Sequence, residues 1–340
     1  MTRPLSILAA ILCLGCAPAP DTPVAPVDPA PVEAVRPAGP HTVGVMEGPQ
    51  TAGGRLYYPA LDGGEARAIT LTEARREKLT QRFGPGVAEA LGRAVTVARV
   101  NAAPARGRFP LVIFAPGSNM AAGDYRLLME DLASRGYVVL ALDPNGAPPA
   151  SEARYGAAAD ELIAALTRIK TDAPAPVAAI MDTGHVALIG HSLGGAAAFI
   201  ALPRAPGAVA INLDGDVMAA PAVPPAASIL YLIGQTPPEN DRSRARRAGT
   251  WRDLSAGVAD AVVLQITDFR HFDYADAALL QEGVPEPMRQ ARFGPLGGQK
   301  AHALTTDLIA AFLDSRLKGD GAAWPAALAR HPEAAAPTTW

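Results

Sequence analysis

The stretch HVALIGHSLGGAAAFIAL, residues 185–202, decides the fold. The apolar run at its start predicts a buried strand, and the alanine-rich run at its end predicts a helix. Between them, residues 190–194 form a G-x-S-x-G pattern, which places Ser192 on a tight strand-to-helix turn at the edge of a sheet. Ser192 is therefore a candidate nucleophile with a helix N-terminus pointing at it. The alternative is a glycine-rich turn with an incidental serine.

Continuous apolar runs recur on both sides of this stretch. They lie at Leu111–Ala115, Tyr137–Asp143, Ala208–Asp214, Ala227–Gly234 and Ala261–Thr267, with shorter strand candidates at 54–59 and 95–100. Helical patterns separate them at Leu71–Gly84, Gly86–Ala94, Tyr125–Gly136, Ser151–Lys170 and Leu304–Lys318. Runs without alternation suit parallel strands that are covered on both faces. The sequence therefore predicts an α/β fold with a doubly wound, mostly parallel sheet.

Three histidines follow Ser192 and are candidates for its base. On a sheet with this turn the chain order is Ser, acid, His, so the base comes last. His302 starts the last predicted helix, and His331 lies in a tail rich in Pro and Ala. His271 follows the last predicted strand, at the carboxyl edge of the sheet where the base is required. We therefore expect His271 to be the base, and a surface-loop histidine is the alternative.

The acid that orients the imidazole should also follow a strand. Asp214 ends one predicted strand and Asp216 lies two residues later. Glu239 and Asp241 follow the next strand. Residue pattern alone leaves Asp214 and Asp241 open as alternatives.

An oxyanion needs two backbone N–H donors. The residue after the nucleophile, Leu193, supplies one. The loop FAPGSNM, residues 114–120, follows an earlier strand and supplies the other, for which we expect the N–H of Ser118 after Pro116-Gly117.

The N-terminus has the pattern of an exported protein. Arg3 precedes an apolar run, Leu5–Leu14, which is short for a membrane span and typical of a signal peptide. Gly15-Cys16 after this run predicts a lipoprotein signal, with Cys16 as the lipidated residue, although Cys13 stands where Leu is preferred. An ordinary cleaved signal is the alternative. Both cysteines of the chain belong to this segment, so the folded part contains no thiol.

Composition sets the domain boundaries. Residues 17–40 contain eight prolines and predict an extended tether. We expect one catalytic domain over residues 41–320 and a peripheral tail over 321–340. A formal net charge of −3 and 5% aromatic residues argue against a nucleic-acid partner. No cluster of metal ligands is visible, and we expect neither a metal nor an organic cofactor.

Four stretches resemble the α/β-hydrolase superfamily, and within it the platelet-activating-factor acetylhydrolase group with its bacterial, dienelactone-hydrolase-like relatives. They are RFPLVIFAPG (108–117), DLASRGYVVLALD (131–143), DTGHVALIGHSLGGAAA (182–198) and RHFDYAD (270–276). In that group the acid ends the strand after the nucleophile's helix, so the resemblance implies Asp214. Pro116 stands where the group often has His, and Leu193 stands where Phe or Met is common. These differences alter the wall of the acyl pocket, so the resemblance does not identify the substrate.

The resemblance implies a cofactor-free serine hydrolase acting on carboxylic esters, either short-chain acyl esters or phospholipid-type acetyl esters. A dienelactone-hydrolase-like or polyester hydrolase is the alternative within enzymes, and a non-catalytic surface lipoprotein is the alternative outside them. With the lipid anchor, the protein would be periplasmic or at the cell surface. Residues 71–94 match a small insertion in bacterial relatives, either a partial cap or an ordinary surface helix pair. Residues 241–253 predict a basic loop, either solvated or a contact for anionic headgroups.

Overall fold

The computed structural model describes residues 27–48, 51, 54–68, 71–144, 153–216, 221–235 and 241–338. The predicted signal segment, with Cys13 and Cys16, lies outside these residues, as do residues 17–26 of the predicted tether. No helix in the described ranges combines the length and apolarity that crossing a bilayer requires.

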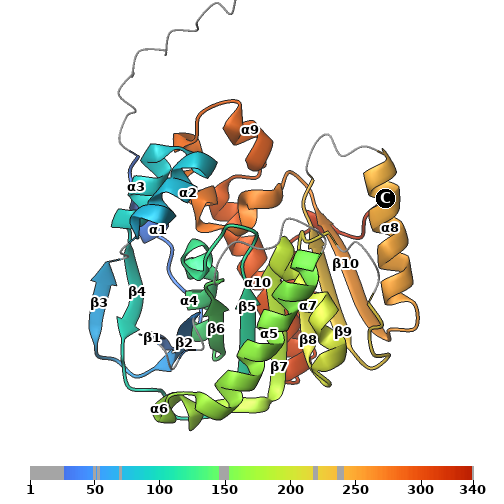
Figure 1. Ribbon diagram of the computed structural model, residues 1–340, viewed down its shortest axis with the longest axis horizontal. Helices are drawn as coiled ribbons and strands as arrows, with labels where there is room; N and C mark the ends of the chain where they lie inside the picture. The colour runs from blue at the N-terminus through green and yellow to red at the C-terminus, as the bar shows by residue number, and fades with distance from the viewer. Residues whose placement is uncertain are drawn as a thin grey trace, which may run out of the picture.

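The described strands form one sheet. Their bounds are β1 Thr42–Glu47, β2 Gly54–Ala60, β3 Glu65–Ala68, β4 Val95–Val100, β5 Phe109–Ala115, β6 Val138–Leu142, β7 Met181–His191, β8 Val209–Leu213, β9 Ser228–Ile233, β10 Asp260–Ile266 and β11 Ala334–Ala335. The order across the sheet is β11-β10-β9-β8-β7-β5-β6-β2-β1-β4-β3 (Figure 1). Strands β6, β5, β7, β8, β9 and β10 are parallel, so their carboxyl ends share one edge. The predicted α/β class with a mostly parallel sheet is confirmed.

Helices cover both faces of the sheet. Their bounds are α1 Ala30–Glu33, α2 Glu73–Phe83, α3 Pro85–Arg93, α4 Arg126–Ser134, α5 Ala153–Asp172, α6 Ala175–Ala178, α7 Leu193–Ala201, α8 Asp241–Ser255, α9 Met288–Arg292, α10 Gly298–Leu317 and α11 Ala323–Arg330. Short 3-10 helices are η2 Ala122–Tyr125, η3 Leu202–Arg204, η4 His271–Tyr274 and η5 Asp276–Gly283. Apolar side chains of α5, α7 and α8 cover one face, and those of α4, α10 and α11 cover the other. A doubly wound sheet results because each crossover places its helix on one of these two faces.

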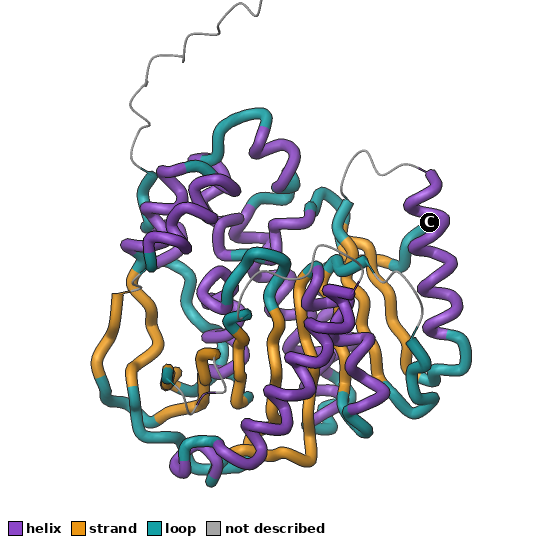
Figure 2. The backbone as a smooth tube through the Cα atoms, viewed as in Figure 1, coloured by secondary structure: helices purple, strands orange, loops and turns teal. Residues whose placement is uncertain are grey.

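A third apolar cluster joins α1, α2, α3 and η5. Figure 2 shows these helices grouped beyond the upper ends of the strands. The two helices predicted at residues 71–94 are present as α2 and α3, and they belong to this cluster rather than to the layers on the sheet.

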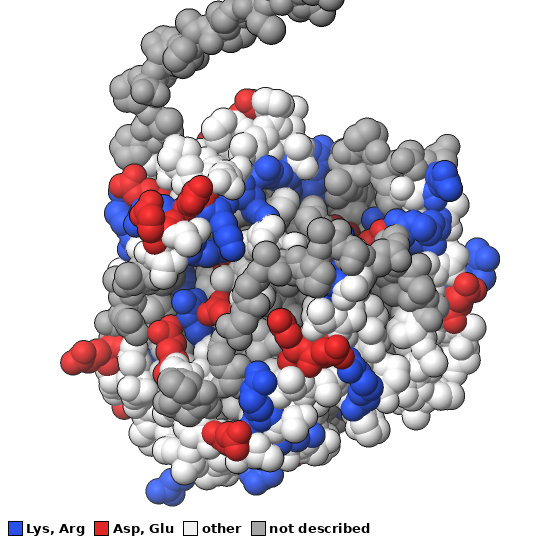
Figure 3. All heavy atoms as spheres, in the orientation of Figure 1, with Lys and Arg blue, Asp and Glu red and all other residues white. Residues whose placement is uncertain are grey.

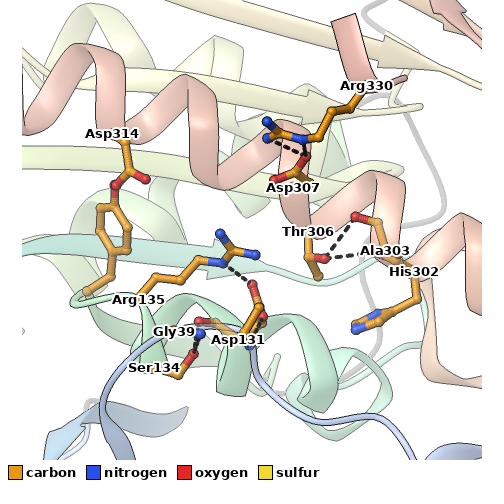
Figure 4. Close-up of polar contacts among 12 residues, drawn as sticks. Gly39, Asp131, Ser134, Arg135, His302, Ala303, Thr306, Asp307, Asp314 and Arg330 are labelled. Atoms are coloured by element: carbon orange, nitrogen blue, oxygen red, sulfur yellow. Dashed lines mark hydrogen bonds and ion pairs between the residues drawn. The ribbon is translucent and has the colours of Figure 1, made fainter. Parts of the chain in front are cut away.

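The N-terminal segment differs from its prediction. A tether was expected through residue 40, but the described residues 27–40 pack on the domain. Val32 of α1 is buried, and the N–H groups of Ala38 and Gly39 donate to Asp131 Oδ1 (2.8 Å) and Ser134 Oγ (2.9 Å) of α4 (Figure 4). A proline-rich segment forms little regular secondary structure, so its remaining N–H groups need acceptors elsewhere, and α4 supplies them for Ala38 and Gly39.

The C-terminal segment also differs. The tail over 321–340 is not peripheral, because α11 packs on α10 and β11 adds a short antiparallel strand to β10. Trp324 is buried, with its ring centroid 5.2 Å from that of Phe312. The frequent Ala and Pro residues predicted a peripheral segment, and a single aromatic anchor overrides that composition.

The predicted basic loop at residues 241–253 is wrong, because this segment is helix α8. Arginine and alanine are good helix formers, and Trp251 packs on the ring of Tyr231 with centroids 5.8 Å apart. The segment was predicted as a loop because it is highly charged and shows no clear apolar face. Two apolar side chains, Trp251 and Leu254, are enough to attach the helix to the sheet.

Candidate active site

Ser192 occupies the turn between β7 and α7. Its backbone has φ +54° and ψ −118°, a region that residues with a β-carbon rarely adopt. The turn is held by hydrogen bonds from Ser192 N to Leu213 O (2.8 Å) and from Ala196 N to Ser192 O (3.1 Å). Ser192 is partly exposed, so its hydroxyl is within reach of a molecule from solution.

Glycines around Ser192 are required by close backbone approach. A β-carbon on Gly190 would lie 2.2 Å from the carbonyl carbon of Gly194, and one on Gly194 would lie 2.1 Å from Ala115 O. Neither contact is sterically possible, so strand, helix and the neighbouring β5 meet here only through glycine. The G-x-S-x-G pattern therefore has the strand–turn–helix context that the sequence predicted.

Asp214 and His271 meet at the carboxyl edge of the sheet. Asp214 follows β8, and its Oδ2 lies 2.7 Å from Nδ1 of His271. The other oxygen of Asp214 accepts the Gly234 N–H at 3.1 Å. Both carboxylate oxygens therefore have partners, which fixes the imidazole with Nδ1 as a donor and leaves Nε2 for a substrate-side group.

Electrostatics keeps Asp214 ionised although it is buried. Burial opposes the charged form, but the hydrogen bond and charge of His271, the Arg247 guanidinium and the Gly234 N–H outweigh it. The pKa of Asp214 is consequently lower than that of an ordinary aspartate. A carboxylate that stays charged is what stabilises an imidazolium on His271.

The other acid candidates lie elsewhere. Asp216 forms a surface ion pair with Arg246, at 2.5 Å. Asp241 is the first residue of α8 and its side chain is outside what the structure describes, as is Glu239. Asp214 is thus the candidate acid that contacts a histidine in the described residues.

The loop after β5 lies against Ser192. A β-carbon on Gly117 would be 3.3 Å from Ser192 Cβ and 3.1 Å from His191 Nδ1. Ser118 follows and is partly exposed, and within the described residues its N–H makes no hydrogen bond. Leu193 is the first residue of α7, where helix N–H groups lack a carbonyl partner from an earlier turn. Two amides at the predicted positions are therefore available next to Ser192.

A buried network links this loop to the histidine loop. Gly117 N–H donates to the Tyr125 hydroxyl (3.2 Å), which lies 2.7 Å from His191 Nδ1. His191 Nε2 lies 2.7 Å from the carbonyl oxygen of His271. A carbonyl only accepts, so Nε2 carries the proton and Nδ1 accepts from the tyrosine. Burial, and then the charge of His271, lower the pKa of His191 well below its ordinary value, so this ring is neutral.

Helix α2 contacts the same loop. Arg82 Nη2 donates to Ser118 O at 3.2 Å, and Arg75 Nη1 donates to Asn119 O at 2.8 Å. The 71–94 segment is therefore not a detached surface pair: it borders the loop beside Ser192, which favours the partial-cap interpretation.

Comparisons with known proteins agree with this architecture. A family model described as serine aminopeptidase S33 matches residues 108–251, which is less than half the chain. A ferulic acid esterase from Streptomyces cinnamoneus has a similar structure, with a TM-score of 0.69 and 24% sequence identity over 88% of this chain and 97% of that chain. No curated protein matches the sequence. The chain therefore has the α/β-hydrolase fold. Its membership of that superfamily, and its closer placement in the platelet-activating-factor acetylhydrolase group, stay predictions.

The other candidate histidines lie around α10 and α11. His302 lines a groove of about 530 Å³ with Asp131 and Asp307 (Figure 4). His331 Nε2 lies 2.9 Å from Asp307 Oδ2. Across the ranges that the structure describes, no three His, Cys, Asp or Glu side chains are grouped as they would be around a metal ion.

Sequence reasoning missed Tyr125, Arg82 and the role of His191 as a link. Tyr125 and His191 are 66 residues apart, and Arg82 and Ser118 are 36 apart. No local pattern marks such contacts, because each depends on how distant elements pack.

Proposed function

We propose that this protein is a serine hydrolase of carboxylic esters, with Ser192 as nucleophile, His271 as base and Asp214 as the acid that orients it. The observation that carries the proposal is the 2.7 Å hydrogen bond between Asp214 and His271. The His271 ring lies 4.5 Å from the ring of His191, which directly precedes Ser192 on its turn at positive φ. The similar structure named as an esterase supports ester rather than amide cleavage.

The mechanism follows from the residues. His271 removes the hydroxyl proton as Ser192 attacks the ester carbonyl, and Asp214 stabilises the resulting imidazolium. The N–H groups of Leu193 and Ser118 stabilise the oxyanion, each contributing of the order of 10²-fold or more in rate. His271 then protonates the leaving alcohol, an acyl group remains on Ser192, and water activated by His271 releases the acid.

A fluorophosphonate probe and 4-nitrophenyl esters of increasing acyl length test this proposal. We expect the wild-type protein to label and to hydrolyse short esters, and Ser192→Ala to do neither. Labelling of Ser192→Ala as strongly as wild type, or no labelling of wild type, would favour the non-catalytic surface lipoprotein instead. A preference for polyester or lactone substrates would favour the dienelactone-hydrolase-like alternative over short-chain or phospholipid-type acetyl esters.

The acid is tested with a matched pair of variants. Asp214→Asn should lower kcat by roughly 10⁴-fold, because the imidazole then adopts the wrong tautomer. Asp241→Asn should leave kcat near wild type. The reverse pattern would make Asp241 the acid.

We also propose that the protein is exported and anchored through a lipid on Cys16. Residues 17–26 precede Val27, which contacts the domain through an Arg93 hydrogen bond to its carbonyl (2.9 Å). Ten residues reach at most about 35 Å, so the anchor would hold the domain near the bilayer. Cys16→Ser should move the protein from the membrane fraction to the soluble fraction, while Cys13→Ser should leave it with the membrane. Membrane retention of Cys16→Ser would contradict the anchor.

A further inference from the structure

Two arginines lie against the ring that follows His271. Arg82 is near the end of α2 and Arg292 ends α9, and their guanidinium carbons lie 5.3 Å and 5.8 Å from the ring centroid of Phe272. Arg292 is also 5.9 Å from the ring of Phe83. Figure 3 shows basic side chains gathered on the face that α2 and α9 share.

These arginines flank the candidate catalytic residues. Arg82 donates to Ser118 O at 3.2 Å, so its guanidinium lies between the Ser118 loop and the histidine loop. A β-carbon on Gly117 of the Ser118 loop would lie only 3.3 Å from Ser192 Cβ, so this loop lies against Ser192. The Arg82 guanidinium therefore contacts the loop that supplies a candidate oxyanion amide, and its charge contributes to the lowered pKa of His191, the residue before Ser192.

Neighbouring arginines on the same helices have acidic partners. Arg75 of α2 pairs with Asp124, and Arg289 of α9 pairs with Glu286 at 2.5 Å. Within the described residues, neither Arg82 nor Arg292 forms an ion pair, and Nη1 of Arg292 is buried without a hydrogen-bond partner.

The carboxylate of Asp124 attracts Arg82 without forming an ion pair with it, and Arg292 has no such partner among the described residues. Two partly buried like charges with so little compensation are unfavourable. Burial lowers the pKa of both guanidinium groups, and the charge of Arg82 lowers that of Arg292 further. Stacking on Phe272 offsets part of this cost but supplies no negative charge. Packing alone therefore does not account for the pair, whereas an anion between the two side chains would.

We propose that Arg82 and Arg292 bind a carboxylate carried by the ester substrate, within a few bonds of the scissile carbonyl. The planar fork of a guanidinium fits a carboxylate through paired N–H···O bonds, and Nη1 of Arg292 is a donor that would otherwise be unused. This inference rests on the proposed ester hydrolysis and specifies its substrate class as acidic esters.

Matched pairs of esters test the inference. One pair places the charge on the acyl side: mono-4-nitrophenyl adipate against 4-nitrophenyl hexanoate. The other places it on the alcohol side: 4-acetoxybenzoate against its methyl ester. The measured quantity is the ratio of kcat/KM for the anionic ester to kcat/KM for the neutral one, at low ionic strength. A ratio cancels any general effect of a variant on folding or on the Ser118 loop.

We expect Arg82→Gln and Arg292→Gln each to lower this ratio about ten- to a hundredfold for at least one pair, as expected for loss of a charge-assisted hydrogen bond. The pair that responds tells whether the carboxylate belongs to the acyl or the alcohol side. Arg289→Gln, on the same helix but ion-paired, is the matched control and should keep the wild-type ratio.

The two proposals fail differently. If neutral esters are cleaved but both ratios are unchanged in Arg82→Gln and Arg292→Gln, the carboxylate site is wrong and ester hydrolysis stands. If wild type cleaves none of the four esters and does not label with the fluorophosphonate probe, ester hydrolysis itself is wrong. An equal fall of the ratio in Arg289→Gln would show a general field of positive charge rather than a site, and would also overturn the inference.

Discussion

At the scale of single residues, backbone strain is concentrated where the candidate catalytic side chains leave the sheet. Within the described residues, five non-glycine positions have positive φ, and four of them follow parallel strands: Asn119, Ser192, Asp214 and Asp268. Asn and Asp tolerate this region, but serine does not, and such a position costs on the order of 1–3 kcal/mol. A hydroxyl retained there at this cost is consistent with selection for chemistry rather than stability.

Glycine should relieve the strain at Ser192. We expect the free energy of unfolding of Ser192→Gly to be about 0.5–1 kcal/mol higher than that of Ser192→Ala. Glycine adopts positive φ freely, whereas alanine keeps the β-carbon. Both variants lack the hydroxyl, so their urea unfolding curves isolate the backbone effect. Equal midpoints for the two would show that the turn is not strained.

The Tyr125 hydroxyl positions two loops at once. Tyr125→Phe leaves the Gly117 N–H and His191 Nδ1 without partners in a buried site, which costs about 1–3 kcal/mol for each group. Because both loops flank Ser192, we expect kcat to fall about tenfold with little change in KM. Steady-state kinetics and urea unfolding on the same samples separate the two effects.

Tyr58→Phe is the control for this variant. Its buried hydroxyl bonds Ala102 O at 2.8 Å, away from the candidate site. It should lose similar stability and keep its kcat. If Tyr125→Phe loses stability but not kcat, the network is structural only.

The sequence predicted Ser192, Asp214 and His271 because each follows an apolar strand, and position after a strand is visible in a single chain. Asp214 needed the resemblance as well, since Asp241 also follows a strand. Tyr125, Arg82 and Arg292 were not predicted, since their significance lies in contacts with Gly117, Ser118 and Phe272 across the fold.

At the scale of elements, η4 carries His271 and is fixed by Asp273. Oδ2 of Asp273 accepts the N–H groups of Arg270 and Gly294, both at 2.7 Å, while Oδ1 is buried without a partner. Burial outweighs these bonds and raises the pKa of Asp273 to about 7. This carboxyl therefore titrates near neutral pH, two residues from His271.

The pH dependence of stability should report this carboxyl. The unfolded chain loses the proton near pH 3.8, and the folded protein keeps it to about pH 7, so the folded state binds more protons in between. The free energy of unfolding therefore falls as pH rises through that window, by up to roughly 4 kcal/mol, and levels off above it. Asp273→Asn does not titrate and should lose much of this fall between pH 5 and 8.

Urea unfolding at pH 5 and pH 8 measures the difference. Glu73→Gln, on an exposed side chain of α2, is the control and should keep the wild-type slope. Burial also raises the pKa of Asp276 to about 8, so Asp276 contributes a fall of the same sign in wild type and in Asp273→Asn. Identical slopes for wild type and Asp273→Asn would contradict an elevated pKa at Asp273.

Elements with continuous apolar runs were predictable, and those attached by few side chains were not. Strands β5, β6, β8 and β9 are covered on both faces, so nearly every position in them is apolar. Helix α8 is attached mainly through Trp251 and Leu254, and the two-residue strand β11 is set by its partner β10. An element attached by only two apolar side chains shows little apolar periodicity in its sequence, so its secondary structure is hard to predict.

At the scale of the whole molecule, both ends of the described chain are part of the domain. Residues 27–40 contact α3, α4 and η5, which shortens the predicted tether to at most ten residues after Cys16. Composition predicted detachment at both ends, because Pro and Ala supply little apolar area. The packing depends instead on single anchors, Val32 at one end and Trp324 at the other.

Removing residues 320–340 should therefore destabilise the whole domain. Trp324 covers Phe312, and Arg316 lies 4.3 Å from the Phe312 ring centroid while pairing with Asp260 of β10 at 2.8 Å. Loss of a buried Trp side chain alone costs about 3–5 kcal/mol. For a domain of this size, that loss lowers Tm by roughly 6–20 °C.

Calorimetry of three proteins tests this expectation: the 320–340 deletion, Trp324→Ala and a deletion of residues 339–340 only. The first two should melt well below wild type, because both expose Phe312 and remove the Trp324 ring, one of the two aromatic rings that Arg316 contacts. The third removes no described contact and should melt with wild type. If the long deletion keeps the wild-type Tm, the tail is peripheral as its composition suggested, and the sheet gains nothing from pairing β11 with β10.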